Sequence, residues 1–278
     1  MYNLASIFFR IHIKFIDNQM KVVILCGGLG TRLKEETEYK PKPMVEVGGR
    51  PLLWHIMKNY SQHGFNEFVL CLGYKGNIIK DYFVNYNIRT SDFTLKLKNH
   101  DISIHNQHAE VDWEITFAET GPDTMTGGRV KKIEKYIDDD IFLLTYGDGV
   151  SDVNIKELLA FHKSHGKIGT VTGVVPPSRF GELVIENNFV KTFSEKPQFD
   201  SRGMINGGYF IFNKKFFSYL SDSEDYILER QPLENLAKDG QLCVFPHKGF
   251  WQCMDTYRDF ELLNSLWNEN KAQWKTWK

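Results

Sequence analysis

The feature that most limits how this sequence can fold is an apolar run that leads directly into a glycine-rich loop. Residues 21–26 read KVVILC, which is typical of a strand buried on both faces of a sheet. The loop that follows, residues 27–33, reads GGLGTRL. Glycines let backbone N–H groups approach phosphate oxygens, and open parallel sheets bind ligands where their strands end. The pattern predicts an anion-binding loop, although a tight turn without a ligand would need the same glycines.

The remaining pattern predicts an α/β fold, because buried strands alternate with amphipathic helices. In the first part we expect strands at residues 67–72 and 141–146, and helices at 51–63, 76–86 and 155–165. In the later part we expect short strands at 168–175, 182–185, 190–194 and 209–212, and helices at 226–238 and 257–268. The expected architecture is three-layered and Rossmann-like, with a mostly parallel mixed central sheet and a strand-rich second half.

The composition and the N-terminal segment argue against several classes of protein. Lys and Arg number 34 against 35 Asp and Glu, a balance that argues against nucleic-acid or membrane-surface binding by bulk charge. Residues 1–19 are expected to be a poorly packed extension, since Arg10, His12 and Lys14 interrupt any signal-peptide core. Residues 20–278 are expected to form a single domain. The four cysteines form no C-x-x-C pair and are expected to be reduced core residues.

Two familiar phosphate-binding loops do not match this one. A dinucleotide-binding fingerprint needs a third glycine where Leu33 stands. A P-loop needs Gly-Lys followed by Ser or Thr, and that sequence is missing here. The sequence therefore argues against a nicotinamide dehydrogenase and against a P-loop enzyme.

The distinctive neighbour of the glycine loop is a lysine between two prolines. Pro41 and Pro43 restrict the backbone on either side of Lys42, ten residues after Arg32. Two cations near one glycine loop suit a triphosphate, which carries several negative charges. A solvated loop lysine is the alternative reading of Lys42.

Together these motifs resemble the sugar-1-phosphate nucleotidyltransferases, also called sugar-nucleotide pyrophosphorylases. The resemblance runs from about residue 20 to the C-terminus and includes GYK at 73–75, YGDG at 146–149, RFG at 179–181, EKP at 195–197, NGGY at 206–209 and WQCMDT at 251–256. Within the family, residues 125–129 and 251–256 are most similar to enzymes that join CTP and α-D-glucose 1-phosphate into CDP-glucose and pyrophosphate. The resemblance implies a nucleotide-binding half at 20–150, a sugar-phosphate-binding half at 151–255 and a C-terminal helical tail at 256–278.

The resemblance also implies the site residues. The catalytic residues would be Lys42, Arg32 and Asp148. The nucleotide would be bound by Leu25, Gly27, Gly28, Leu29, Gly30, Thr31, Arg32, Lys42, Thr124, Gly128, Arg129 and Gly147. The sugar phosphate would be bound by Glu195, Lys196, Asn206, Gly207 and Tyr146. Mg²⁺ would be held by Asp148 and Asp255, since this ion prefers oxygen ligands.

Several of these residues have simpler structural readings. Asp148 can cap a turn, Asp255 can be a helix N-cap, and Tyr146 can belong to the core. Glu195 and Lys196 can be a surface pair at the end of a strand.

The implied chemistry needs alignment and charge compensation more than a general base. A phosphate oxygen of the sugar phosphate attacks the α-phosphorus in line, and pyrophosphate leaves on the opposite side. The choice of cytosine rests on the resemblance alone, so UTP or dTTP is an alternative, as is a regulatory module that binds a nucleotide sugar without catalysis. The family further implies a cytoplasmic homo-oligomer that supplies precursors for O-antigen and other surface polysaccharide.

Overall fold

The computed structural model describes residues 20–106, 108, 110, 112–176, 182–186, 189–194 and 203–277. The predicted extension at 1–19, the motif at 179–181 and the predicted sugar-phosphate residues Glu195 and Lys196 lie outside the described residues.

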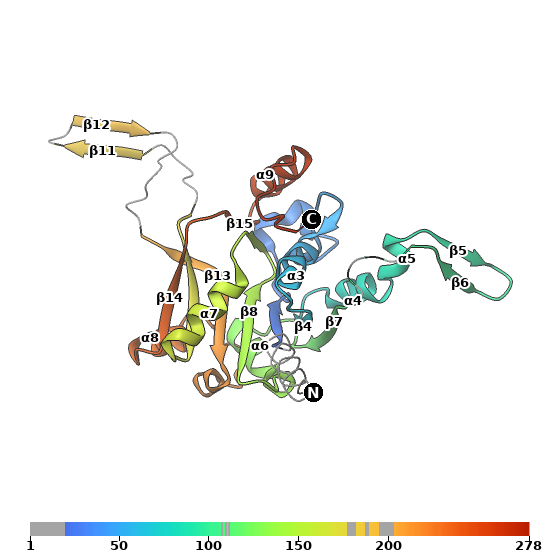
Figure 1. Ribbon diagram of the computed structural model, residues 1–278, viewed down its shortest axis with the longest axis horizontal. Coiled ribbons are helices and arrows are strands. Elements are labelled where there is room, and N and C mark those ends of the chain that lie inside the picture. The colour runs from blue at the N-terminus through green and yellow to red at the C-terminus, as the bar shows by residue number, and fades with distance from the viewer. Residues whose placement is uncertain are drawn as a thin grey trace, which may run out of the picture.

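A seven-stranded sheet forms the centre of the molecule, in the order β14-β10-β13-β8-β1-β4-β7 (Figure 1). Its strands are β1 (Val22–Leu25), β4 (Glu67–Leu72), β7 (Glu114–Glu119), β8 (Ile141–Tyr146), β10 (Gly169–Val174), β13 (Ile205–Asn213) and β14 (Leu242–His247). Neighbours from β8 to β7 are parallel, and β10 is parallel to β14, whereas β13 is antiparallel to both β8 and β10. The predicted mostly parallel mixed sheet is confirmed.

Two hydrophobic cores, one on each face of the sheet, produce the three layers. In β1, Val22 and Ile24 pack into one core, and Val23 and Leu25 pack into the other. Helices α3 (Leu52–Gln62), α4 (Gly76–Val84) and α7 (Ile155–His165) contribute to the first core, and α6 (Thr126–Lys132) and α8 (Gln231–Lys238) contribute to the second. The continuous apolar run therefore reflects burial on both faces.

Short elements connect this framework. Among the described residues they include the helical elements η1 (Thr31–Leu33), α2 (Lys34–Thr37), η2 (Lys42–Met44), α5 (Tyr86–Thr90), η3 (Glu134–Tyr136), η4 (Lys214–Tyr219) and α9 (Tyr257–Asn268). The strand pairs are β2 (Glu46–Val47) with β3 (Arg50–Pro51), β5 (Phe93–Lys96) with β6 (Asp101–Ile104), β9 (Gly149–Ser151) with β15 (Trp251–Cys253), and β11 (Glu182–Glu186) with β12 (Phe189–Ser194).

The structure differs from the sequence-based prediction in several places. The β5–β6 hairpin, which extends away from the body in Figure 1, was not predicted. Its residues do alternate between apolar and polar, and the register pairs Phe93 with Ile104 and Leu95 with Ile102, but all eight strand residues are exposed. Strands β7 and β14 were not predicted. Helix α8 begins at Gln231 rather than at residue 226, since Pro232 favours the first turn of a helix.

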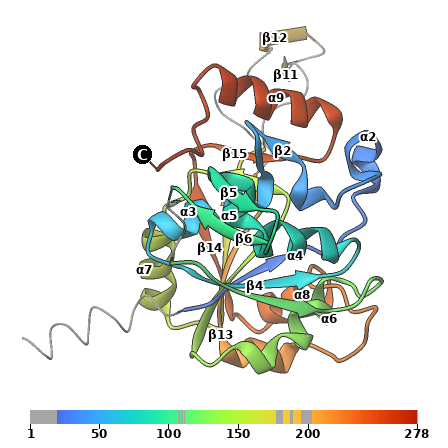
Figure 2. The same cartoon turned by 90° about the vertical axis from the view of Figure 1, so that its right-hand side faces the viewer.

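The C-terminal tail packs on its own domain through its tryptophans. The ring centroids of Trp267 and Trp274 lie 4.9 and 6.2 Å from that of His55 in α3. In Figure 2, α9 lies at the end of the sheet near β2 and β15. Among the described residues, no helix combines the length and the apolar character that a membrane span requires.

Candidate active site

Two cavities meet where β1 and β8 end. One, of about 450 Å³, lies against the glycine loop, and the other, of about 430 Å³, lies beside β13 and β15. Both are lined by Arg32, Thr126, Tyr146, Asp148 and Asp255. A larger cavity of about 690 Å³ lies beside the β5–β6 hairpin, but it lacks both the glycine loop and the paired aspartates. We therefore place the site at the junction of the two smaller cavities.

The first cavity brings together eleven of the twelve predicted nucleotide-binding residues. They are Leu25, Gly27, Gly28, Leu29, Gly30, Thr31, Arg32, Lys42, Thr124, Arg129 and Gly147. Gly128 does not line this cavity. Its N–H donates to the carbonyl of Tyr226 at 3.0 Å, and a Cβ at this glycine would lie 2.8 Å from the carbonyl oxygen of Ser223. Gly128 therefore serves close packing of α6 rather than the cavity wall.

The glycine loop has one open position and one tightly packed position. A Cβ at Gly28 would meet nothing within 4 Å, whereas a Cβ at Gly27 would lie 2.2 Å from the Arg129 guanidinium. Gly30 has a φ of 64°, in the left-handed region that favours glycine. The Thr37 hydroxyl lies 3.0 Å from the Gly30 carbonyl oxygen and fixes this turn.

Arg129, which we expected to contact the nucleotide, also stabilises the glycine loop through hydrogen bonds. Its side chain is buried, and burial lowers the pKa of its guanidinium from the ordinary value. The guanidinium nitrogens lie 2.7–3.1 Å from the Thr120 hydroxyl and from the carbonyl oxygens of Gly27, Leu72, Gly121 and Pro122. Because these acceptors belong to the loops around the cavity, Arg129 holds the cavity walls together.

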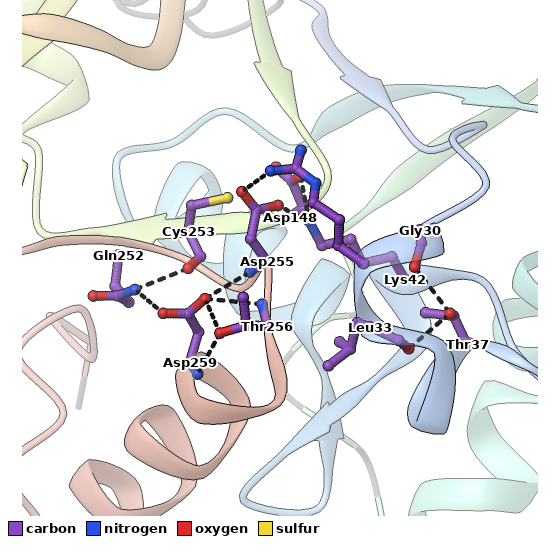
Figure 3. A network of polar contacts seen from close by, with 11 residues as sticks. Gly30, Leu33, Thr37, Lys42, Asp148, Gln252, Cys253, Asp255, Thr256 and Asp259 are labelled. Atoms are coloured by element: carbon purple, nitrogen blue, oxygen red, sulfur yellow. Dashed lines mark hydrogen bonds and ion pairs between the residues drawn. The ribbon is translucent and has the colours of Figure 1, made fainter. Parts of the chain in front are cut away.

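Lys42 lies between the two predicted metal ligands (Figure 3). Its Nζ is 2.8 Å from Oδ2 of Asp148 and 2.6 Å from Oδ1 of Asp255. Nη1 of Arg32 lies 3.0 Å from Oδ2 of Asp255, although the Arg32 side chain is 76% exposed. The three predicted catalytic residues and both predicted metal ligands therefore meet at one point.

Strand pairing explains why residues so distant in the sequence meet here. β15 pairs with β9 in an antiparallel register that places Cys253 opposite Gly149. The Met254 N–H then donates to the Asp148 carbonyl at 2.8 Å, so the next residue, Asp255, lies beside Asp148. The N-cap of α9 is Thr256 in a capping box with Asp259, so the alternative interpretation of Asp255 as the N-cap of this helix is wrong.

The ion pairs of this site favour the charged forms of Lys42 and Asp255. Burial alone would lower the pKa of Lys42, but the charge of Asp148 and the hydrogen bonds to both carboxylates raise it above its ordinary value. Burial alone would raise the pKa of Asp255, but Lys42 and Arg32 hold it below its ordinary value. Two carboxylates converging on a cationic group also suit a hard divalent ion such as Mg²⁺.

The second cavity gathers the predicted sugar-binding residues that the structure describes. Tyr146, Asn206 and Gly207 line it, and Nδ2 of Asn206 lies 3.3 Å from the Tyr146 hydroxyl oxygen. The ring of Tyr146 also packs edge-on against Phe210, so its core and cavity roles coexist. Nε1 of Trp251 donates to the Gly207 carbonyl at 2.7 Å and fixes the floor of the cavity.

Sequence reasoning missed Glu229. The Tyr146 hydroxyl donates to its Oε1 at 2.5 Å, and the Thr126 hydroxyl donates to its Oε2 at 2.7 Å. Glu229 lines the second cavity, and its carboxylate holds two residues that line both cavities. No signal in the sequence marks Glu229, because it precedes α8 in a segment that we expected to be helical.

Sequence reasoning also assigned Cys253 to the core. Its thiol instead belongs to a cluster with the carboxylates of Asp148 and Asp255. Burial and the two carboxylates raise the pKa of this thiol well above its ordinary value. The signal in the sequence was its position two residues before Asp255, which became informative only once β15 was known to pair with β9.

Comparisons with known proteins agree with this geometry. The nucleotidyl transferase family model matches residues 21–269. The glucose-1-phosphate cytidylyltransferase of Salmonella typhi is 51% identical over 93% of this chain and 100% of its own length. The probable glucose-1-phosphate cytidylyltransferase of Bacillus subtilis is 47% identical over 93% of this chain and 100% of its own length.

A solved structure agrees as well. The crystal structure of HddC from Yersinia pseudotuberculosis matches with a TM-score of 0.63 and 27% identity, over 90% of this chain and 100% of that one. The match to the family model covers most of the chain, and the relatives are matched over their whole length. On these grounds, the chain belongs to the nucleotidyl transferase family.

Proposed function

We propose that this protein transfers a cytidylyl group from CTP to α-D-glucose 1-phosphate, giving CDP-glucose and pyrophosphate. The observation that carries the proposal is the meeting of Lys42, Arg32, Asp148 and Asp255 at the junction of two cavities. One cavity holds the glycine loop and the other holds Asn206 and Gly207. The relatives of 51% and 47% identity support cytidine and glucose 1-phosphate as the substrates.

The reaction forms one P–O bond and breaks another. A phosphate oxygen of glucose 1-phosphate attacks the α-phosphorus of CTP, and the bond from that phosphorus to the bridging oxygen of the β-phosphate breaks, releasing pyrophosphate. The attacking oxygen is already anionic near pH 7, so no base has to remove a proton. The barrier lies in aligning two anions and compensating their charge.

The residues at the junction supply that alignment and compensation. The backbone around the open position at Gly28 receives the triphosphate, and Lys42 and Arg32 lie where its negative charge would gather. In the second cavity, Asn206 and Gly207 receive the sugar, with Glu195 and Lys196 as predicted partners. Asp148 and Asp255 would hold Mg²⁺, which, when bound, supplies further positive charge to the phosphates.

Turnover with separate nucleotides tests the proposal. The purified full-length protein is incubated with glucose 1-phosphate, Mg²⁺ and either CTP, UTP or dTTP, and pyrophosphate release is followed. We expect turnover with CTP to exceed the others by at least about tenfold, since each 1.4 kcal/mol of discrimination gives a factor of ten. Equal or faster turnover with UTP or dTTP would reject cytidine. Binding of CTP without pyrophosphate release would instead favour a regulatory module.

Three predictions about the cellular context accompany this function. A homo-oligomer is proposed from the family resemblance, and sedimentation of the purified protein tests it. The proposed cytoplasmic location and the proposed independence from membranes and nucleic acid are tested by fractionation of cells that express the protein.

A further inference from the structure

The thiol of Cys253 lies beside the two carboxylates of the proposed metal site. Its Sγ and one carboxylate oxygen each of Asp148 and Asp255 all lie within 4.8 Å of one another. Backbone pairing sets this arrangement, because Cys253 is opposite Gly149 in the β9–β15 register and the Met254 N–H bonds to the Asp148 carbonyl. Backbone pairing therefore places the three residues that carry these donor atoms side by side, and Figure 3 shows them from close by.

This donor set differs from the one that Mg²⁺ requires. Mg²⁺ takes oxygen ligands and gains nothing from a thiol. Zn²⁺ and Co²⁺ bind thiolate and carboxylate together, with zinc–sulfur distances of about 2.3 Å and zinc–oxygen distances of about 2.0–2.2 Å. Ligands around one such ion lie roughly 3–4 Å apart, so small side-chain adjustments bring these three donors into range.

An ion can reach the cluster from the second cavity. Asp148, Cys253 and Asp255 all line that cavity, and the Cys253 side chain is only partly buried. The ammonium of Lys42 now lies against both carboxylates, so an entering ion takes over these contacts. A doubly charged ion that also gains a sulfur ligand competes with Lys42 better than an ion limited to oxygen.

We propose that Cys253 is a third metal ligand, which makes this site prefer Zn²⁺ and Co²⁺ to Mg²⁺. As the metal–sulfur bond forms, the thiol proton passes to solvent, and no electron is transferred. The inference rests on the proposed function only in assigning Asp148 and Asp255 to a metal. It adds a soft ligand to that pair, so Zn²⁺ bound through Cys253 excludes Mg²⁺ from the same carboxylates.

Cobalt spectroscopy tests the inference without reference to catalysis. The full-length metal-free protein is titrated with Co²⁺, and sulfur-to-cobalt charge-transfer absorption in the near ultraviolet is recorded for four forms. The wild type and Cys243→Ser are expected to show this absorption, because Cys243 lies in β14, outside the cluster. Cys253→Ser is expected to lose the absorption. Asp255→Asn is expected to need at least tenfold more Co²⁺ to develop it, because disturbing the groups around a metal typically lowers its affinity by about tenfold or more.

Zinc affinity provides the second measurement. In competition with a chromophoric chelator, Cys253→Ser is expected to weaken Zn²⁺ binding by about a hundredfold or more, while Mg²⁺ affinity changes less than threefold. Wild-type protein that binds Co²⁺ without sulfur absorption, or fails to bind Co²⁺, would overturn the inference. So would absorption that persists in Cys253→Ser. A protein that gives the cobalt spectrum but no CDP-glucose would retain the metal inference and lose the proposed function.

Discussion

The ammonium of Lys42 lies 2.8 Å from Oδ2 of Asp148, although 106 positions separate the two residues in the chain. The same ammonium lies 2.6 Å from Oδ1 of Asp255. Lys42 therefore stands at the electrostatic centre of the site, where its removal leaves two carboxylates facing each other. Because of these contacts, substitutions at Lys42 and at its partners should each have a definite effect on the reaction.

Replacing Lys42 with Ala should lower kcat/KM for CTP by about a hundredfold to a thousandfold. This corresponds to roughly 3–4 kcal/mol, the usual loss when one electrostatic donor to a reacting group is removed. Steady-state pyrophosphate release measures the effect. Lys40→Ala is the matched control, since Lys40 is two residues away and pairs with Glu36 at 3.9 Å. Turnover of Lys42→Ala within threefold of the wild type would remove Lys42 from its proposed role.

Replacing Asp148 with Asn should abolish most of kcat, because the amide removes one of the two charges that would hold Mg²⁺. We expect a loss of at least about a hundredfold at saturating Mg²⁺ and a rise in the Mg²⁺ concentration needed for half-maximal rate. Asp222→Asn, at an exposed position, serves as the control. An unchanged Mg²⁺ dependence in Asp148→Asn would contradict the metal assignment.

Alanine at Gly27 should lower the stability of the protein, whereas alanine at Gly28 should weaken the binding of CTP. The Cβ of Gly27→Ala would collide with the Arg129 guanidinium, so we expect a loss of about 1–3 kcal/mol in the free energy of unfolding. Gly28→Ala meets no neighbour, so its stability should stay within about 0.5 kcal/mol of the wild type. Its methyl group would instead crowd the proposed phosphate site and raise the KM for CTP about tenfold. Urea unfolding and initial rates separate the two effects, and a normal KM in Gly28→Ala would argue against phosphate binding there.

Replacing Glu229 with Gln should raise the KM for glucose 1-phosphate more than the KM for CTP. The carboxylate accepts the Tyr146 hydroxyl at 2.5 Å, and a neutral amide holds this hydroxyl less strongly. We expect about a tenfold rise for the sugar phosphate, equivalent to about 1.4 kcal/mol. Glu234→Gln, at an exposed position in the first turn of α8, should change neither constant. Equal rises in both constants would assign Glu229 a general structural role.

The buried His55 should make the fold sensitive to acid. Its Nε2 lies 2.8 Å from the Val47 carbonyl oxygen and its Nδ1 lies 3.4 Å from Nε1 of Trp274, an arrangement that suits the neutral ring. Burial lowers the pKa of His55 from 6.5 to about 4. Between these two values the unfolded state binds a proton that the folded state does not, so stability falls as pH falls.

Comparison with His55→Gln isolates this effect. As pH falls from 6.5 to 4, the wild type should lose up to about 3 kcal/mol more of its free energy of unfolding than His55→Gln. His105→Gln, at an exposed position, should follow the wild-type profile. Urea unfolding across this range measures the difference, and parallel profiles for the wild type and His55→Gln would reject the assignment.

Local patterns in the sequence were sufficient to predict the five inner strands of the sheet and several of its helices, but not the edge strands β7 and β14. Residues 22–25 are apolar without interruption because β1 is buried on both faces, and the α7 periodicity reflects one buried face, whereas α3 is buried at eight of its eleven residues. The glycine loop and the prolines around Lys42 marked the anion site, because backbone freedom and backbone restriction are properties of single residues. The exposed β5–β6 hairpin also alternates apolar and polar residues, but this short alternation was not interpreted as strands.

What the sequence determined by itself was therefore the five inner strands of the central sheet, the glycine loop and the identity of the charged residues. Only the tertiary structure decided which of those charges meet, because the β9–β15 register brings Asp255 and Cys253 beside Asp148 across about a hundred residues of chain. It likewise bonded Arg129 to the glycine loop, packed Gly128 into α6 and placed Glu229 in the wall of the second cavity. Such contacts depend on the pairing of distant segments, which no local spacing of residues encodes.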